Sequence, residues 1–173
     1  MRKRLSYLIA GLTVVSMIAC KGQTASDKST NETTVAASTG NDPAPVHLTR
    51  DQFLKQVMNY EKNPNTWVFE GDKPCLVDFY ADWCAPCRIT SPILEDLAKQ
   101  YAGKINFYKV DVDNEQELAS VFGIQSIPTF LFCPLEGDPT ISTGIANTPA
   151  ATKAMFIKQI EELLLKSNAE PTI

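Results

Sequence analysis

Two cysteines, Cys84 and Cys87, lie three positions apart behind a tryptophan in the stretch ADWCAPCR, residues 81–88. Two thiols at this spacing can bind a metal ion, form a structural disulfide or act as a reversible redox couple. A thiolate attacks a disulfide sulfur far faster than a thiol does, so a redox couple needs one cysteine that is exposed and partly ionised near neutral pH. The residues around the pair and the first twenty residues of the chain bear on this choice.

Cys84 is predicted to stand at the start of a helix. A β-rich run at residues 75–81 ends at the motif, and a helix is predicted from the motif to about Tyr101. Unpaired N–H groups and the helix dipole favour negative charge at a helix N-terminus, which makes Cys84 the candidate nucleophile. Cys87 lies one turn further along on the same face. We expect it to be more buried and to resolve the mixed disulfide.

A zinc site is the metal alternative for this pair. It would need a second pair of ligands at compatible positions. The remaining candidates are Cys75 and Cys133, both within predicted strands, and His47, which is the one histidine of the chain. We therefore expect no metal site.

Cys75 and Cys133 raise a separate question. The strands that carry them should run antiparallel and side by side, so a cross-strand disulfide is one interpretation. Two buried free thiols that pack as small apolar side chains are the other interpretation, and the one we favour. Sequence does not fix the register of two strands to one residue, so this choice stays open.

Asp78 lies in the middle of an apolar strand, between Val77 and Phe79. Desolvation disfavours a charged carboxylate there, so Asp78 should bind a proton more readily than in water. Just beneath the cysteines, it could take the proton from Cys87 when that thiol attacks. The alternative is a structural aspartate that backbone hydrogen bonds hold at a strand irregularity.

The first twenty residues have the pattern of an export signal. Three basic residues at positions 2–4 precede a mostly apolar run from Leu5 to Ala19, and Cys20 follows. The run is too short and wrongly flanked for a mature membrane span. A cysteine directly after a small residue resembles the bacterial lipoprotein signal, in which cleavage leaves a lipid-modified cysteine at the new N-terminus. An ordinary cleaved secretory signal is the alternative.

The segments that follow are interpreted from their composition. Residues 20–45 are rich in Ser, Thr, Asn and Ala, and such a stretch buries too little surface to fold. We therefore predict a signal peptide at 1–19, a lipid-anchored flexible linker at 20–45 and a folded domain at 46–173. Export would place the domain cysteines where disulfides persist and where a dithiol needs a dedicated supply of electrons.

A formal net charge of −4 gives no basic surface for nucleic acid, so that class of partner is set aside. Within the domain, strands and helices alternate. Strands are predicted at 46–48, 67–69, 75–81, 105–113, 129–133 and 140–144, and helices after a Thr49–Gln52 capping box, from the motif to about 101, at 114–123 and at 148–166. The order predicts an α/β domain with a mixed sheet and helices on both faces.

A series of landmarks resembles the thioredoxin family. VDFYADWCAPC, Pro92 five residues after Cys87, YKVDVDNE, IQSIPTF and the glycine of STGIA occur in the family's content and order over residues 46–166. The resemblance implies a thioredoxin fold, with a central mixed β-sheet of about five strands flanked by about four helices. It also implies a thiol–disulfide oxidoreductase without a bound cofactor. Ala85 stands where the family usually has glycine, a position that bears on the redox potential.

The resemblance also implies roles for individual residues. Asp78 corresponds to the family's proton acceptor and Lys109 to the nearby lysine that tunes it. Ile127–Pro128 resembles the cis-proline loop, whose backbone would lie beside Cys84 and pair with an extended substrate segment. The predicted substrate-binding residues, with Gly144 permitting close approach, are Trp83, Ala85, Pro86, Ile127, Pro128, Gly144 and Ile145.

We therefore predict a monomeric, exported, membrane-tethered oxidoreductase that reduces or exchanges protein disulfides. Its partners would be disulfide-containing proteins, an electron-supplying reductase and, through Cys20, a membrane. One alternative is a thioredoxin dedicated to cytochrome maturation, but those relatives typically carry a glutamate between the second cysteine and Pro92, and an inserted segment before Lys109. The other is a non-catalytic binding module, against which the intact dithiol and Asp78 argue.

Overall fold

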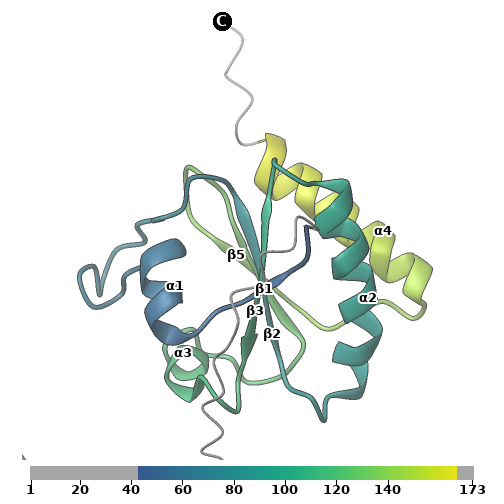
Figure 1. Cartoon of the computed structure of the whole chain (residues 1–173), viewed down its shortest axis with the longest axis horizontal. Coiled ribbons are helices and arrows are strands. Elements are labelled where there is room, and N and C mark those ends of the chain that lie inside the picture. The colour runs from purple at the N-terminus through teal and green to yellow at the C-terminus, as the bar shows by residue number, and fades with distance from the viewer. Residues whose placement is uncertain (1–42, 167–173) are drawn as a thin grey trace, which may run out of the picture. The chain divides into compact units, whose positions relative to one another are not determined.

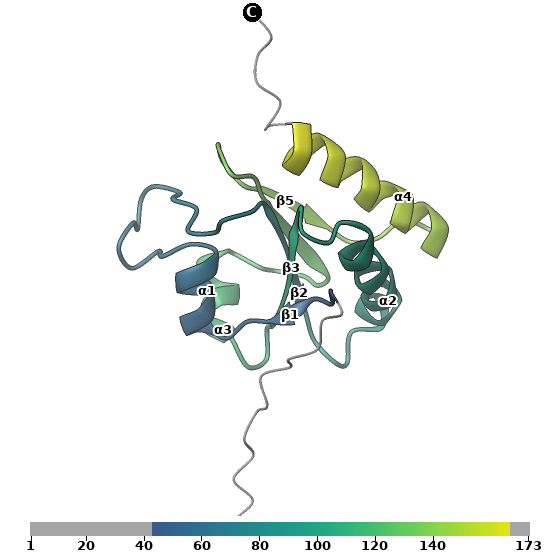
Figure 2. The same ribbon diagram turned by 45° about the horizontal axis from the view of Figure 1, so that its top comes forward.

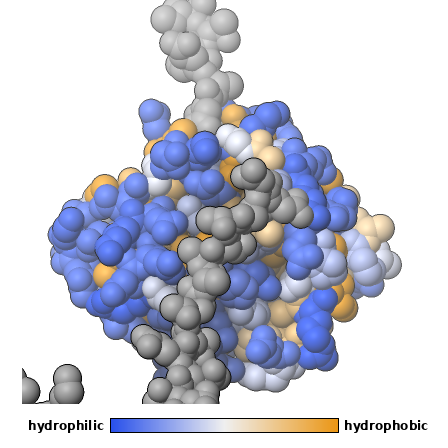
Figure 3. All heavy atoms as spheres, viewed as in Figure 1, coloured by the Kyte–Doolittle hydropathy of each residue, from blue (hydrophilic) through white to orange (hydrophobic). Residues whose placement is uncertain are grey.

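The computed structural model describes residues 43–166, which form a β-sheet with helices on both faces (Figure 1). The predicted signal peptide, Cys20 and most of the predicted linker lie outside the described residues. Within residues 43–166, none of the helices has the length and apolar character of a membrane span. Figure 3 shows hydrophilic side chains over most of the face that it draws, with apolar ones scattered among them.

The sheet has five strands, the number that the resemblance implied. Across the sheet the order is β1 (Val46–His47), β3 (Asn106–Asp111), β2 (Cys75–Tyr80), β4 (Thr129–Cys133) and β5 (Thr140–Thr143). The first three lie parallel to one another, β4 runs antiparallel to β2, and β5 runs antiparallel to β4. All six residues of β2 are buried, because this strand has neighbours on both sides and helices on both faces.

Two helices cover each face of the sheet (Figures 1 and 2). They are α1 (Arg50–Gln56), α2 (Ala85–Gln100), α3 (Gln116–Val121) and α4 (Pro149–Gln159), which continues into a π-helical segment at Ile160–Leu165. Helices α2 and α4 pack on one face and α1 and α3 on the other, each with its own apolar core. Phe156, Ile160 and Leu164, four residues apart, are fully buried and attach the last helix to the sheet.

Two helix starts follow from local sequence, as predicted. At α1 the Thr49 hydroxyl accepts the N–H of Gln52, and the Gln52 side chain accepts the N–H of Thr49 at 2.9 Å. At α4 the Thr148 hydroxyl accepts the N–H of Ala151 at 3.1 Å, and Pro149 occupies the first turn.

The predicted strand at 67–69 is wrong. This segment forms a single bridge between Met58 and Phe69, and it is otherwise a loop. The reason is packing: Trp67 and Phe69 stack with ring centroids 6.5 Å apart and pack against the core that α1 and α3 share. Apolar side chains can reach a core from a loop, so a run of them is not specific to a strand.

Cys75 and Cys133 are direct partners across β2 and β4. Both are fully buried on the sheet face that α1 and α3 cover, and the structure contains them as free thiols. Burial and a hydrogen bond with the Cys75 side chain raise the pKa of Cys133. In this state the pair packs as small apolar side chains, as favoured from the sequence.

Candidate active site

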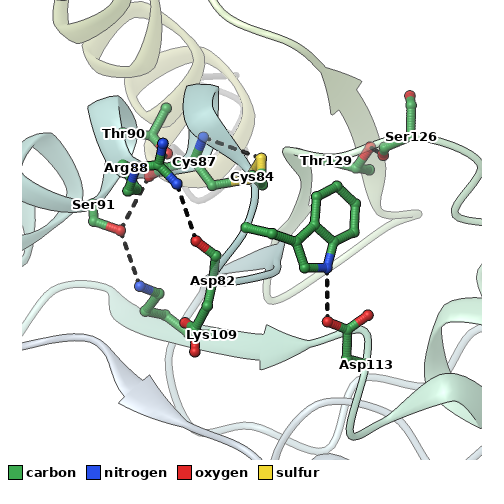
Figure 4. Close-up of a disulfide and its surroundings, with 11 residues drawn as sticks. Asp82, Cys84, Cys87, Arg88, Thr90, Ser91, Lys109, Asp113, Ser126 and Thr129 are labelled. Atoms are coloured by element: carbon green, nitrogen blue, oxygen red, sulfur yellow. Dashed lines mark hydrogen bonds between the residues drawn. A yellow bond between two sulfur atoms is a disulfide. The ribbon is translucent and has the colours of Figure 1, made fainter.

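Cys84 and Cys87 lie where β2 ends and α2 begins. Cys84 is the N-cap of α2, and the two sulfur atoms form a disulfide of 2.03 Å, so the structure shows the oxidised form. The backbone N–H of Cys87 donates to Cys84 Sγ at 3.2 Å (Figure 4). In the reduced form the same N–H, together with the positive end of the helix dipole, is placed to stabilise a thiolate at Cys84.

The expectation of an exposed Cys84 and a more buried Cys87 does not hold in the oxidised form. The two residues are 3% and 2% exposed, so exposure does not distinguish them. Tyr80 and Ala81 pack around the disulfide, and Ile127 packs against it from the opposite loop. The position of Cys84 at the helix N-terminus, and not its exposure, therefore supports its predicted role as nucleophile.

A zinc site at Cys84 and Cys87 would need a second pair of ligands close by. Among the described residues, no three His, Cys, Asp or Glu side chains gather into a group that could hold a metal ion. Cys75 and Cys133 lie on the other face of the sheet from α2, at the far end of β2 from the disulfide. They are therefore not placed to join Cys84 and Cys87 around one ion.

Trp83 forms an exposed apolar surface beside the disulfide, as predicted. Its residue is 66% exposed, and its indole N–H donates to Asp113 Oδ2 at 2.8 Å (Figure 4). Beside it lies a groove of about 580 Å³. The groove is lined by Trp83, Val112, Gln116, Ala119, Ser120, Ile124, Gln125, Ser126 and Ile127.

The lining from α3 and the loop after it was missed in the sequence. These residues lie 32 or more positions after Cys84, and no local signal links them to the motif. Val112 and Ile127 line this groove and pack against the cluster around the cysteines, and Trp83, which also lines it, directly precedes Cys84 in the chain. The groove extends the predicted substrate surface away from α2.

The Ile127–Pro128 peptide bond is cis, as the resemblance implied. The loop is held at both ends: Thr129 Oγ1 donates to the Ser126 carbonyl at 2.7 Å, and the Gly144 N–H donates to the Pro128 carbonyl at 2.9 Å. Because Ile127 packs against the disulfide, this backbone lies beside the cysteines.

Gly144 is required by its backbone conformation. A Cβ atom at this position would meet no atom within 4 Å, so close packing does not demand glycine. Its φ of +82° does, because side chains strain the backbone in that region. Of the other predicted substrate-binding residues, Ala85 is exposed, and Pro86 and Ile145 are half-buried.

Asp78 is fully buried in β2, on the sheet face that α2 covers. Neither carboxyl oxygen has a hydrogen-bond partner among the described residues, so the alternative of an aspartate held by backbone hydrogen bonds is wrong. Burial raises the pKa of Asp78 from 3.8 to about 7. The positive charge of Lys109, the residue paired with Asp78 on the neighbouring strand β3, opposes that rise. A carboxyl group with this pKa can accept a proton and release it near neutral pH.

Lys109 reaches from β3 toward α2. Its Nζ donates to Ser91 Oγ at 3.1 Å and lies 4.2 Å from the centre of the Tyr80 ring. Ser91 Oγ in turn donates to the Cys87 carbonyl at 3.1 Å (Figure 4). The sequence indicated Lys109 but not Ser91, although a serine four residues after Cys87 on a helix has the spacing for such a backbone bond.

The fold and the geometry of the site agree with what known proteins show. The family model described as thioredoxin matches residues 46–160, which is more than half of the chain. The chain belongs to the thioredoxin family. A thioredoxin from Borreliella burgdorferi is 48% identical over 105 residues, covering 61% of this chain and 89% of that protein. One from Haemophilus influenzae is 38% identical over 92 residues, covering 53% and 84%.

Solved thioredoxin structures are also similar. A point mutant of a thioredoxin from Halobacterium salinarum NRC-1 matches with a TM-score of 0.52 and 26% identity, over 72% of this chain and 95% of that one. Together these relatives confirm the predicted thioredoxin fold, and with it a thiol–disulfide oxidoreductase that acts on disulfide-containing proteins.

Proposed function

We propose that this thioredoxin is exported, tethered to a membrane by lipid at Cys20, and reduces or exchanges disulfides of proteins outside the cytoplasm. The family supports the chemistry. The location is inferred from the basic, then apolar, first nineteen residues with Cys20 directly after a small residue. The polar segment 21–45 would give the domain reach from the membrane surface.

The observation that carries the catalytic roles is the hydrogen bond from the Cys87 N–H to Cys84 Sγ at the start of α2. In the reduced enzyme, the Cys84 thiolate attacks one sulfur of a substrate disulfide. A mixed disulfide forms, and the second substrate sulfur leaves as a thiolate that takes a proton from water. Ile127, which packs against the disulfide cluster, also lines the groove beside Trp83, so the groove and the cis-proline loop are placed to hold the substrate segment.

The second step regenerates the disulfide seen here. Cys87 loses its proton to the Asp78 carboxylate and attacks Cys84 Sγ, which releases the first substrate sulfur as a thiolate that is then protonated. The substrate gains two electrons and two protons, and the enzyme becomes the Cys84–Cys87 disulfide. Another cycle therefore requires a dithiol reductase that returns two electrons, and we propose such a protein as the second partner.

Thiol–disulfide exchange in this scheme needs no bound cofactor. We also propose that the chain acts as a monomer. The scattered apolar side chains in Figure 3 are in keeping with a surface that faces water. Sedimentation of the purified protein tests the monomer, since a stable dimer would contradict it.

The two alternatives have less support. Residues 88–91 read RITS, without the acidic residue typical of cytochrome-maturation relatives, and the connection from α2 at Gln100 to β3 at Asn106 is too short for an insert. A non-catalytic binding module would not need an intact cysteine pair or an unpaired carboxyl group beneath it.

Single-cysteine variants test the proposed roles. Cys84→Ser should abolish reduction of a disulfide-linked peptide, because no thiolate remains at the helix start. Cys87→Ser should instead accumulate a persistent mixed disulfide with the peptide, detected as an added mass that dithiothreitol removes. Substantial turnover by the Cys84 variant, or no trapped adduct in the Cys87 variant, would refute the assignment.

A further inference from the structure

The side chain of Ser91 connects Lys109 to the turn of α2 that carries the resolving cysteine. Its oxygen accepts a hydrogen bond from the Lys109 ammonium at 3.1 Å, and its hydroxyl donates to the Cys87 carbonyl at 3.1 Å. Figure 4 shows the three groups in this order, from β3 up to the helix. A hydroxyl that accepts on one side and donates on the other is fixed in orientation by both partners.

The ammonium is near Asp78 without bonding to it. Asp78 and Lys109 are direct partners on neighbouring strands, yet neither Asp78 oxygen has a hydrogen-bond partner in the described part of the chain. The contacts that the structure gives to Lys109 Nζ are the Ser91 hydroxyl and the face of the Tyr80 ring. The position of the charge therefore depends on α2 and on Tyr80, and not on a salt bridge.

Other titratable groups surround this position. They are Tyr80 and Asp82 at the end of β2, Asp111 of β3, His47 of β1, Glu95 and Lys99 of α2, and Glu115 before α3. Strand β4 contributes Phe130 opposite Asp78. Unlike these groups, Lys109 has a charge that shifts the pKa of Asp78, and it lowers that pKa.

We propose that Ser91 is a positioning residue for Lys109, holding its ammonium beside α2 and within electrostatic reach of Asp78. The hydroxyl thereby adjusts how readily Asp78 accepts the proton of Cys87. This deepens the proposed function, since the consequence for turnover rests on Asp78 as the proton acceptor.

The direction of the effect follows from the contacts. Without the hydroxyl, the partly buried ammonium keeps the Tyr80 ring and loses its hydrogen-bond acceptor. A lysine has a long flexible stem, so its charge then moves outward to water, where it is better solvated. The attraction between the two charges falls with their separation, and the Asp78 carboxylate becomes less stable relative to its protonated form.

Thr90 provides a matched control. Its hydroxyl donates to the same Cys87 carbonyl at 3.0 Å, but no contact with Lys109 accompanies that bond. Thr90→Val keeps the shape and removes one donor to that carbonyl. Ser91→Ala removes the other donor and, in addition, the acceptor for Lys109.

The experiment measures Asp78 directly in the oxidised full-length protein, by following its carboxyl carbon signal through a pH titration. Ser91→Ala should raise the titration midpoint by about 0.5 to 1 pH unit. Thr90→Val should leave it in place, and Ser91→Thr, which restores a hydroxyl, should return it toward wild type. In a Lys109→Met background, Ser91→Ala should cause no further change. A midpoint that stays or falls in Ser91→Ala, or that moves equally in Thr90→Val, would overturn the inference.

A second readout separates this inference from the proposed function. The pH dependence of mixed-disulfide release should shift upward with the Asp78 midpoint in Ser91→Ala. If the midpoint moves as expected while release keeps its pH dependence, Ser91 positions Lys109 but Asp78 is not the proton acceptor. That result would support the inference about position and overturn the catalytic step.

Discussion

Replacing Asp78 with asparagine should make the domain more stable at neutral pH and a poorer catalyst. Burial raises the pKa of Asp78 from 3.8 to about 7, a difference of about 3 pH units between unfolded and folded chain. Below about pH 4 the carboxyl group is protonated in both states. As pH rises to about 7, only the unfolded state ionises, so the wild type loses about 1.4 kcal/mol of unfolding free energy per pH unit.

Above pH 7 the loss is complete, at about 4 kcal/mol. Asparagine has nearly the same shape and does not titrate, so its stability should lack this pH dependence. Any cost of burying its unpaired amide is the same at every pH and cancels in the comparison.

Urea unfolding of the oxidised proteins at pH 4 and pH 8 measures this difference. The advantage of Asp78→Asn over wild type should grow between the two pH values by about 4 kcal/mol, or roughly 2 to 3 M in urea midpoint. Asp138→Asn, which removes an exposed carboxyl group, controls for the change in net charge. Asp78→Asn should also release the mixed disulfide more slowly than wild type at neutral pH. A constant stability difference, with normal release, would refute the reasoning.

Three further predictions concern the lipid anchor at Cys20, the substrate-binding surface at Trp83 and the buried thiols. Cys20→Ala should release the protein from the membrane fraction of an expressing bacterium or leave an uncleaved precursor; unchanged retention with normal processing would contradict lipidation. Trp83→Ala should raise the KM for a protein disulfide severalfold while the unfolding free energy changes by about 1 kcal/mol or less, because the indole is mostly exposed and loses one hydrogen bond to Asp113. Cys75 and Cys133 should react with a maleimide no faster than the domain opens, since both are fully buried, and rapid labelling in native buffer would show otherwise.

The parts of the site that depend on neighbours a few residues apart could be predicted from the sequence. Cys84 and Cys87 are positioned by one helical turn, and the Thr49 and Thr148 caps by bonds to residues three positions on. Asp78 could be found because a charged residue inside an apolar strand has few explanations other than function or strain. In each case the physical cause lies within a short segment, so the sequence contains it.

The remaining features depend on contacts between distant segments. Lys109 lies 18 positions from Ser91, and only the packing of α2 over β3 brings them together. The low exposure of Cys84 likewise reflects Ile127 in another loop. Sequence alone could not show that Trp67 packs as part of a loop, because an apolar run is common to loops over a core and to edge strands.

The register that places Cys75 opposite Cys133 also protects the enzyme from disulfide scrambling. Cys75 is the first residue of β2, and its last residue, Tyr80, precedes the Cys84 motif, so five steps of strand, roughly 17 Å, separate the two ends. The buried pair also lies on the face covered by α1 and α3, whereas Cys87 lies in the first turn of α2, the helix on the other face. Exchange needs sulfur atoms in contact, so while the domain is folded the catalytic pair can cycle between dithiol and disulfide without drawing Cys75 or Cys133 into a wrong pairing.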